Sequence, residues 1–580
     1  MFLRSILALW SLAFLCLQTG AEAQTQCVCV QITTEWDGNY KGLFSVETTI
    51  DFTGLRVNFT FSDVLDGLEY YSGHTLQVDD THYYLTDERF EGRAGELVEF
   101  DFHVMFSGEK PLVIEAYMNW EDVCDGSGDW TTPTPMVNPC DPTGMLPYDY
   151  SQVLCMSYLF YEAQRSGPLP ADNRVTWRGD SALGDGSDVG IDLTGGYFDA
   201  GDHVKFGFPM AFTTTMLAWG LIDFAEGHQI AGQTEYGLAT VKWATDYFLK
   251  AHTATSEFYG QVGEGNVDHA YWGRPEDMTM ERPSMKIDSD KPGSDLAGET
   301  AAALAAASIA FKDVDSAYAA TLLQAAEELY QFADERRDVY HNSITDAANF
   351  YRSWSGYGDE LCWAALWLAR ATGSDTYLQK ARVHWDDFDL GSMAEQFSWD
   401  DKKGGVFALY TLLDSSPEYS DALQGFLDHV RNDKPYTPGG LVFLDVWGAN
   451  RHAANVAFLA LWAAKHDLNV ETNRQWAESQ INFLLGDVGH SFVVGYGVDP
   501  PQRPHHRGSS CPSPPVACET SWAQQQTGPN PHVLYGALVG GPAQDGTYVD
   551  DRMDYVHNEV ACDYNAAFTG VLAAMVELQK

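Results

Sequence analysis

The stretch Tyr548-Val-Asp-Asp-Arg-Met-Asp-Tyr-Val-His-Asn-Glu-Val-Ala-Cys-Asp-Tyr-Asn565 joins a cluster of carboxylates to the small-residue, apolar segment 566–578. Apolar residues at helical spacing predict a helix over 565–578. If that helix extended back through the stretch, Tyr555, Glu559 and Asp563 would share a face, because residues four apart are neighbours on a helix. A carboxyl beside an aromatic ring and a like charge has a raised pKa, which a general acid needs near neutral pH. Glu559 is therefore a candidate general acid. For the aspartates the alternative is a solvated, metal-binding or capping face.

Ten further segments, all after Tyr148, have helical apolar spacing and are joined by long loops rich in Gly, Pro and aromatic residues. They span 150–165, 210–226, 235–251, 298–311, 317–336, 359–371, 404–413, 419–431, 453–466 and 472–485. Alanine-rich runs suit close helix–helix packing, and no fixed repeat of the solenoid type is present. The spacing predicts a large all-α domain, and the number of helices with elaborate loops suggests an α/α barrel.

The first part of the chain differs in character. Residues 1–23 carry one early positive charge, a short apolar run and an Ala-x-Ala site, which predicts a signal peptide and a secreted, extracellular protein. In residues 24–124, short alternating segments (44–50, 55–61 and 97–105) lie between Gly and Asp turns and predict a small all-β sandwich module. The proline-rich residues 125–147 predict a linker, and residues 148–580 form the all-α domain.

Composition limits the partners. The net charge of −48 in 580 residues argues against nucleic acid and anionic membranes, and no run after the leader reaches membrane-spanning length. A neutral substrate and a monomer are expected. The ten cysteines suit a secreted chain with disulfide bonds. The expected pairs are Cys27 or Cys29 with Cys124, and Cys511 with Cys518, whereas Cys155, Cys362 and Cys562 are expected to be buried thiols.

Two loop segments add candidate catalytic groups. In Gly195-Gly-Tyr-Phe-Asp-Ala-Gly-Asp-His203, Asp199 and Asp202 could face one water, one accepting its proton and the other orienting it. An Asx turn or helix cap is the alternative. With Glu559, the pair would supply the acid and base carboxylates of glycoside hydrolysis. In 500–507, two histidines and Arg507 follow prolines; in so acidic a chain we expect them to neutralise carboxylates or bind ligand hydroxyls rather than form a surface basic patch.

From about Tyr148 to its end, the chain resembles glycoside hydrolase family 9 cellulases. The resemblance covers the whole domain in order. It rests on long motifs that include Asp199-Ala-Gly-Asp202, Asp268-His-Ala-Tyr-Trp272, Pro292-Gly-Ser-Asp-Leu-Ala-Gly-Glu299, Trp354-Ser-Gly-Tyr-Gly-Asp-Glu360, Phe397-Ser-Trp-Asp-Asp-Lys402, Pro504-His-His-Arg507 and Tyr548–Asn565.

The N-terminal module resembles family 2 carbohydrate-binding modules through Trp36-x-x-x-Tyr40-x-Gly42-x-Phe44. That family binds cellulose with a strip of exposed Trp. The candidates in this module are Trp36 and Trp120, with tyrosines such as Tyr70, Tyr71, Tyr83 and Tyr84; packing of both Trp in the core is the alternative.

The family 9 resemblance implies an (α/α)6 barrel with an open cleft that hydrolyses internal β-1,4-glucosidic bonds of cellulose and related β-glucans with inversion. It implies that Asp202 is the general base, that Asp199 helps to hold the water, and that Glu559 is the general acid. His505 and Asp550 are assigned to the same catalytic group. The implied substrate contacts are His269, Trp272, Tyr351, Trp354, Trp447, Arg451, Arg507 and Tyr564. No cofactor is expected for catalysis.

A structural calcium ion is implied as well, because carboxylates and backbone oxygens suit a hard cation. The implied ligands are Ser355, Gly356, Asp359, Glu360 and Asp400. The alternative is that Asp359 and Glu360 only cap the following helix, whose N-terminal dipole favours carboxylates.

Two other functional hypotheses stay open. One is a processive enzyme, or one that acts on mixed-linkage glucan or xyloglucan, since loops at the cleft ends decide between these. The other is a non-catalytic carbohydrate-binding protein, which would have no need of Asp199, Asp202 and Glu559 together.

Overall fold

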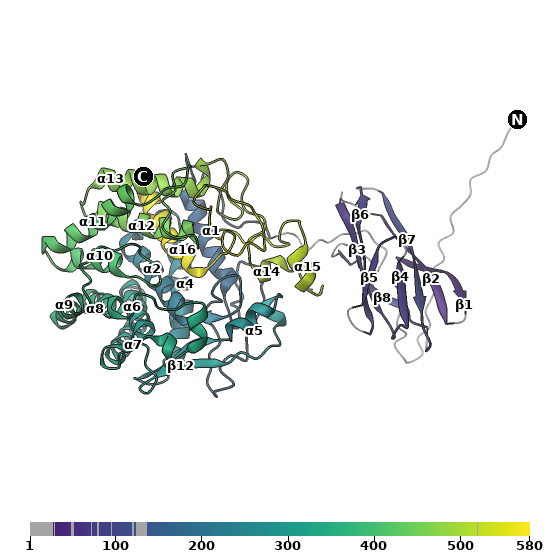
Figure 1. The fold of residues 1–580 in the computed structure, drawn as a ribbon, viewed down its shortest axis with the longest axis horizontal. Coiled ribbons are helices and arrows are strands. Elements are labelled where there is room, and N and C mark those ends of the chain that lie inside the picture. Colours follow the sequence, from purple (N-terminus) through teal and green to yellow (C-terminus); the bar gives the residue numbers. More distant parts are fainter. Residues whose placement is uncertain are drawn as a thin grey trace. The chain divides into compact units, whose positions relative to one another are not determined.

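The computed structural model describes residues 27–580 except 28, 37, 48–51, 71, 78–79, 94–95, 109, 119–120, 123–135, 515 and 519. The predicted signal peptide and the first half of the predicted linker therefore lie outside the described residues. The chain divides into two compact units, Met1–Thr134 and Pro135–Lys580. Figure 1 shows strands in the first unit and mostly helices in the second.

The first unit contains two antiparallel sheets. One has the order β1 (Val30–Trp36), β2 (Asn39–Glu47), β7 (Leu97–Met105), β4 (Gly67–Tyr70). The other has the order β5 (His74–Gln77), β6 (His82–Gly92), β3 (Phe52–Phe61), β8 (Val113–Met118), β9 (Glu121–Asp122). Apolar residues alternate along β7, as a strand with one buried face requires. Across the core, the ring of Phe59 lies 5.8 Å from that of Phe44 and 4.9 Å from that of Phe102.

Three of the tyrosines proposed for a binding strip in this unit are core residues. Tyr70, Tyr83 and Tyr84 are buried, so they cannot present a ring face to a polysaccharide. Trp36, by contrast, is 43% exposed and stacks on His103 at 5.1 Å. Trp120 and Tyr71 lie outside the described residues.

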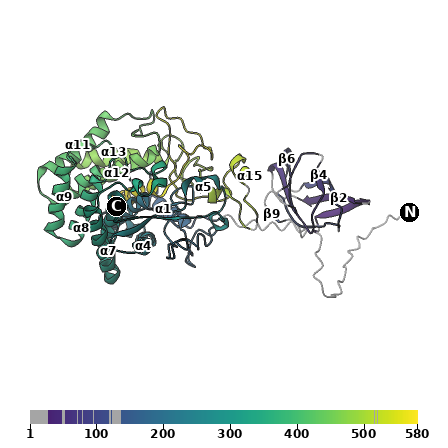
Figure 2. The same cartoon turned by 60° about the horizontal axis from the view of Figure 1, so that its bottom comes forward.

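Six long helices of the second unit pack in a closed ring, each against the next (Figure 1). Figure 2 shows the same unit turned by 60°. In ring order they are α2 (Gly207–Asp223), α6 (Ser294–Phe311), α8 (Gly358–Thr372), α10 (Lys403–Leu413), α12 (Ala449–Lys465) and α16 (Cys562–Leu578), which returns to α2. Nearly every residue of α2, α6 and α16 is buried, as expected for helices that are apolar all round.

Six further long helices pack outside the ring, each mainly on one ring helix. They are α1 (Tyr150–Gln164) on α16, α4 (Thr234–Ala251) on α2, α7 (Ser316–Glu335) on α6, α9 (Asp375–Asp387) on α8, α11 (Pro417–Asp433) on α10 and α13 (Val470–Asn482) on α12. Shorter elements occupy the loops: α3 (Ala225–Ile230), α5 (Gly265–Ala270), α14 (Arg507–Ser510), α15 (Thr520–Gln525), and the sheet β10 (Lys205–Phe206), β11 (Glu257–Val262), β12 (Ser284–Asp288).

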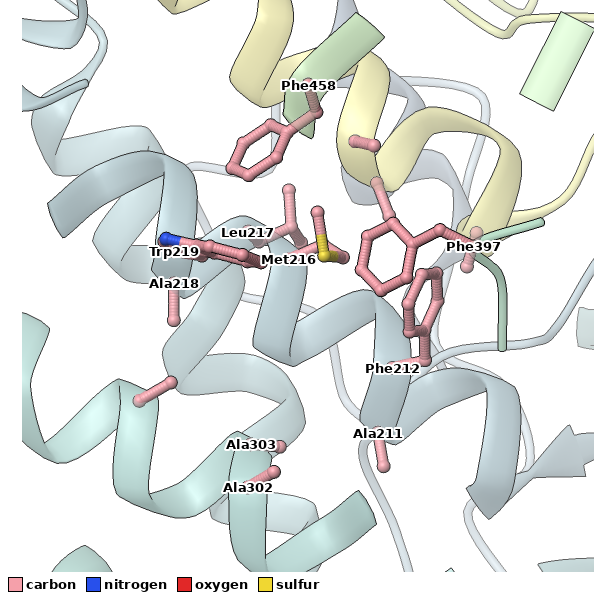
Figure 3. Packing of buried hydrophobic residues seen from close by; sticks show 14 of the residues in the cluster. Ala211, Phe212, Met216, Leu217, Ala218, Trp219, Ala302, Ala303, Phe397 and Phe458 are labelled. Carbon is pink, nitrogen blue, oxygen red and sulfur yellow. The ribbon is translucent and has the colours of Figure 1, made fainter. Parts of the chain in front are cut away.

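Aromatic pairs fill the inside of the ring (Figure 3). The ring of Trp219 on α2 lies 5.0 Å from that of Phe458 on α12, and Phe212 lies 5.6 Å from Phe397. On α6 the alanines, among them Ala302 and Ala303, let three neighbouring helices approach closely.

The long helices lie where the spacing placed them, with three differences, and the short helices α5, α14 and α15 were not predicted. The predicted helix 210–226 is two helices, α2 and α3, and α9 was not predicted. The predicted helix 472–485 ends at Asn482, before a wider turn (Phe483–Asp487) in which Gly486 has a φ of 138°.

The cysteine predictions were partly right. Cys511 pairs with Cys518, and Cys362 and Cys562 are buried thiols. The prediction of a thiol at Cys155 was wrong, because this residue forms a disulfide with Cys140, with a Cα–Cα distance of 5.7 Å. Cys27 is disulfide-bonded, whereas Cys124 lies outside the described residues. Among the helices that the structure describes, none combines the length and the hydropathy of a membrane span.

Candidate active site

The loops that lead into four ring helices meet at one place. Asp199 and Asp202 precede α2, Tyr351 precedes α8, Trp447 precedes α12, and Glu559 precedes α16. The backbone N–H of Cys562, the first residue of α16, donates to the Asp199 carbonyl at 2.8 Å, which ties two of these loops together. Helix N-termini present unpaired N–H groups and a positive dipole end, so this end of the ring favours carboxylates.

The spacing Asp199-Ala-Gly-Asp202 follows from a close approach of two loops. A Cβ at Gly201 would lie 2.0 Å from the His505 carbonyl oxygen, so only glycine fits there. The Arg507 N–H also donates to the Gly201 carbonyl at 3.0 Å. The loop that carries Asp199 and Asp202 therefore packs directly against the loop that carries His505.

Asp202 is held in its charged form. Its Oδ1 accepts from the Ala200 N–H at 3.2 Å, and its Oδ2 lies 3.0 Å from Nε2 of His269 on α5. Burial alone would raise the pKa of Asp202, but the hydrogen bond and charge of His269, with Arg507 nearby, bring that pKa below its ordinary value. The same contact raises the pKa of His269 against the effect of burial. Asp202 is therefore suited to accept a proton.

Asp199 is held in its neutral form. It is buried, and its Oδ2 accepts a short hydrogen bond from the Tyr351 hydroxyl, while Oδ1 has no hydrogen-bond partner among the described residues. Burial, then the charge of Asp202, raises the pKa of Asp199 well above its ordinary value, although the Tyr351 hydrogen bond opposes this. The two aspartates thus share one negative charge, placed on Asp202.

Glu559 does not lie on a helix, so the predicted shared face with Tyr555 and Asp563 was wrong. The helix begins at Cys562, and Glu559 is in an extended segment that pairs with His505. Its Oε2 accepts from the Trp447 indole N–H at 2.8 Å and from the Tyr564 hydroxyl at 3.3 Å.

The pKa of Glu559 has the direction that the sequence predicted. Burial raises it to about 7; the indole hydrogen bond opposes this, and the charges of Asp202 and Asp563 add to it. The cause is therefore mainly desolvation rather than a helix face shared with like charge. A carboxyl with this pKa is suited to donate a proton near neutral pH.

A buried ion pair between Arg451 and Asp563 lies beside Glu559. Arg451 Nη1 donates to Asp563 Oδ2 at 2.8 Å, Arg451 Nη2 donates to the Trp447 carbonyl at 3.1 Å, and the guanidinium lies over the Tyr564 ring. Arg451 thereby fixes both residues that donate to Glu559. Arg451 is 7% exposed, and the contacts that the structure shows for it are contacts within the protein.

His505 and Arg507 belong to the site, and Trp272 supports them. His505 Nδ1 donates to the Arg552 carbonyl at 2.7 Å, which assigns the proton to Nδ1 and leaves Nε2 as an acceptor. Trp272 is only 3% exposed, its indole N–H donates to Ser510 Oγ at 2.8 Å, and its ring contacts both His505 and Arg507. The proposed sugar contact at Trp272 is therefore a packing contact in this structure.

Asp550 contacts the segment that leads into His505. Its carboxylate accepts from the backbone N–H groups of Gln502 at 2.9 Å and Arg503 at 3.0 Å. Since these residues lead into His505, the contacts give Asp550 a positioning role for that loop.

Three exposed aromatic side chains lie on the loops that carry the site residues. Trp354 is 74% exposed with the Arg352 guanidinium over its ring, and Trp447 is 42% exposed. Tyr555 is 52% exposed and its ring lies 5.6 Å from that of Trp447. Exposed flat rings of this kind suit stacking on pyranose faces.

Asp268 was missed in the sequence. It is 1% exposed, its Oδ1 accepts from the His203 N–H at 3.1 Å, and it adjoins Asp202 and His269. The available signal was its place directly before His269 in the Asp268–Trp272 motif.

The predicted calcium ligands form a separate cluster at the start of α8. Asp359 and Glu360 lie in the first turn of that helix, as capping would also require. Asp400 accepts from the Trp354 N–H at 2.7 Å, and the Ser355 hydroxyl donates to the Asp400 carbonyl at 2.6 Å.

Lys402 is the buried cation of this cluster. Its Nζ lies 3.0 Å from Glu360 and 3.3 Å from Glu299, and its backbone N–H donates to Asp359 at 2.7 Å. Burial and the Asp359 charge raise the pKa of Glu360 well above its ordinary value, and its Oε2 has no hydrogen-bond partner in the described chain. One ammonium group thus lies among several carboxylates, and the calcium assignment for these residues stays a prediction.

The helical unit matches known proteins over its whole length. Residues 150–572 match the model of glycosyl hydrolase family 9. The chain is 49% identical to Endoglucanase B of Cellulomonas fimi over an alignment of 457 positions, which covers 74% of this chain and 42% of that protein. The chain therefore spans less than half the length of that relative.

Two solved structures have the same fold in this region. The endoglucanase of the termite Nasutitermes takasagoensis is 58% identical with a TM-score of 0.74, covering 75% of this chain and all of that one. The cellulase Cel9M of C. cellulolyticum, solved with cellobiose, is 38% identical with a TM-score of 0.69, covering 74% and 99%. The chain belongs to glycosyl hydrolase family 9. The prediction of a family 9 glycoside hydrolase is confirmed.

Proposed function

We propose that the protein is an endo-β-1,4-glucanase that cleaves internal bonds of cellulose and related β-glucans with inversion. One observation carries the proposal: the site holds two carboxyls whose pKa values are pushed apart, Glu559 to about 7 and Asp202 below its ordinary value. Environments that separate two such values identify an acid and a base. The names of the relatives, and cellobiose in one related structure, support a β-1,4-glucan as substrate.

The reaction needs one water and two proton transfers. Asp202 accepts a proton from the water as its oxygen attacks the anomeric carbon, and neutral Asp199, held by Tyr351, orients that water. Glu559 donates its proton to the glycosidic oxygen, which leaves with the bonding electron pair. The negative charge moves from Asp202 to Glu559, and solvent then restores both protonation states. Inversion requires about 6.5–9.5 Å between base and acid.

We assign substrate contacts first to the exposed groups: Trp447 and Trp354 offer ring faces, and His269 offers its imidazole. His505, Arg507, Tyr351 and Tyr564 surround the carboxyls, and we assign them hydrogen bonds to the sugar at the point of cleavage. Arg451 and Asp550 act by positioning. We also propose that the ring of helices is the (α/α)6 barrel of the family and that it presents this site in an open cleft.

Two further assignments complete the proposal. Ser355, Gly356, Asp359, Glu360 and Asp400 would hold a calcium ion, which would neutralise buried carboxylates and fix the loop that carries Trp354. In the N-terminal unit, Trp36 is the residue that we propose for contact with cellulose. Secretion through residues 1–23 stays a prediction.

The test is loss of viscosity and release of reducing sugar on carboxymethylcellulose, with wild type beside Glu559→Gln. Fast loss of viscosity in wild type, reduced about 10²–10⁴-fold in the variant, is the expected result. Equal activity of the two proteins would remove Glu559 as the acid. Slow loss of viscosity with rapid release of short sugars would favour a processive enzyme. Cellulose binding with no turnover on any glucan would favour a binding protein.

A further inference from the structure

Beside the proposed base, three metal-ligating side chains meet in a group that the hydrolytic mechanism does not need as a group. Asp202, Asp268 and His269 each offer one ligand atom, and these atoms all lie within 4.8 Å of one another. Two of the residues are consecutive on α5, and the third comes from the aspartate loop. We propose that this group binds a divalent transition ion such as Zn²⁺, and that binding reversibly inhibits the enzyme.

A buried oxygen that accepts no hydrogen bond points to a ligand in this group. Asp268 is 1% exposed, and one of its oxygens accepts from the His203 N–H. The other, Oδ2, accepts no hydrogen bond among the described residues, and the Arg282 guanidinium stays 3.9 Å away from it, beyond hydrogen-bond distance. A buried carboxylate oxygen without a donor is costly, and a cation there would satisfy it.

The donor set suits a borderline metal rather than calcium. One imidazole nitrogen and two carboxylate oxygens are ligands that Zn²⁺ accepts in tetrahedral sites, with the fourth position left to water. Zn²⁺ ligands lie about 2.0–2.2 Å from the ion, so the three atoms would have to move together by about an ångström. His269 Nε2 and Asp202 Oδ2 are already 3.0 Å apart in a hydrogen bond, and the Nε2 proton must leave to solvent when the ion binds. The His269 side chain is 39% exposed, which gives an ion access from solvent.

Nearby cations set a limit on the affinity. Arg282 Nη1 lies 3.9 Å from Asp268 Oδ2, and Arg507 acts on both aspartates. We therefore expect weaker binding than in a dedicated structural zinc site.

Binding would stop hydrolysis through Asp202. An ion on its Oδ2 takes the lone pair that must accept the proton of the water, so the base is lost while Glu559 is unchanged. This inhibition rests on the proposed function, whereas the binding does not.

Calorimetric titration of the full chain with ZnCl₂ at neutral pH, in Ca²⁺-saturated buffer so that the calcium cluster is filled, tests the binding. The key variant is Asp268→Asn, and Asp313→Asn on an exposed loop is the matched control. One zinc site is expected in wild type and in the control, with affinity reduced about tenfold or more in Asp268→Asn. If Asp268→Asn fails to fold, His269→Gln is titrated instead, with the same expected loss.

Inhibition is measured on carboxymethylcellulose with the same proteins. The Zn²⁺ concentration for half-inhibition should rise with the loss of affinity in Asp268→Asn, and a chelator should restore activity. No stoichiometric site, or equal binding in Asp268→Asn and the control, would overturn the proposal. Zinc binding lost in Asp268→Asn, in a protein inactive on every glucan, would leave the metal site standing and remove the proposed function.

Discussion

Replacing Trp447 with phenylalanine should move the pH dependence of the enzyme upward. The indole N–H donates to Glu559 Oε2 at 2.8 Å, and this hydrogen bond lowers the pKa of Glu559 against burial. A hydrogen bond to a charged group contributes about 1.5–3 kcal/mol, and one pKa unit corresponds to about 1.36 kcal/mol. Because Tyr564 still donates and water replaces part of the lost bond, we expect a rise of about one unit, from about 7 to about 8.

The assay is kcat/KM against pH on a soluble chromogenic cello-oligosaccharide, which reports the pKa values of the free enzyme. A general acid must be protonated, so wild-type activity should fall as the pH rises through about 7. The activity of Trp447→Phe should fall at a pH about one unit higher. Trp354→Phe is the matched control, since Trp354 is 74% exposed and its ring contacts Arg352. Loss of sugar stacking should change its KM, whereas its basic limb should coincide with that of wild type. A basic limb of Trp447→Phe at or below that of wild type would refute the reasoning.

Three other perturbations test separate parts of the structure. Tyr351→Phe removes the donor to Asp199, so we expect kcat to fall about tenfold, or about 1.4 kcal/mol, with an unchanged melting temperature; an unchanged kcat in steady-state kinetics would contradict the water-holding role. Removal of calcium with a chelator should lower the melting temperature by a few degrees, reversed by Ca²⁺ and not by Mg²⁺; identical melting curves would remove the calcium assignment. Lys402→Met leaves two buried glutamates without their cation, and should lower the free energy of unfolding by about 3–5 kcal/mol in urea denaturation; a wild-type midpoint and slope would show that these carboxyls are neutral in the folded protein.

The sequence predicted the fold class well because apolar spacing reports burial directly. Eleven segments were found, and α9 was missed because its exposed face is rich in charged residues: only Ala381, His384 and Trp385 of that helix are buried. The split between α2 and α3 was missed because the apolar run continues across it. The Cys140–Cys155 bond could not be predicted from spacing, since it joins a loop to the helix that follows and depends on how that loop folds back.

The site shows a similar division. Motifs identified Asp199, Asp202 and Glu559, but spacing assigned Glu559 to a helix face, whereas pairing with the distant His505 holds it in an extended segment. Trp272 and Trp354 looked alike in sequence, yet one is buried and the other exposed. Such differences depend on contacts between loops far apart in the chain, which local patterns do not record.

The most direct test of the central claim is the stereochemistry of the first product. Proton NMR of wild-type enzyme on a soluble β-1,4-cello-oligosaccharide, recorded before mutarotation, distinguishes the anomers at the new reducing end. If a water activated by Asp202 attacks opposite to the group protonated by Glu559, the first product is the α-anomer. A first product with the β-anomer would mean a covalent intermediate on one carboxylate, and would contradict the assignment of base and acid.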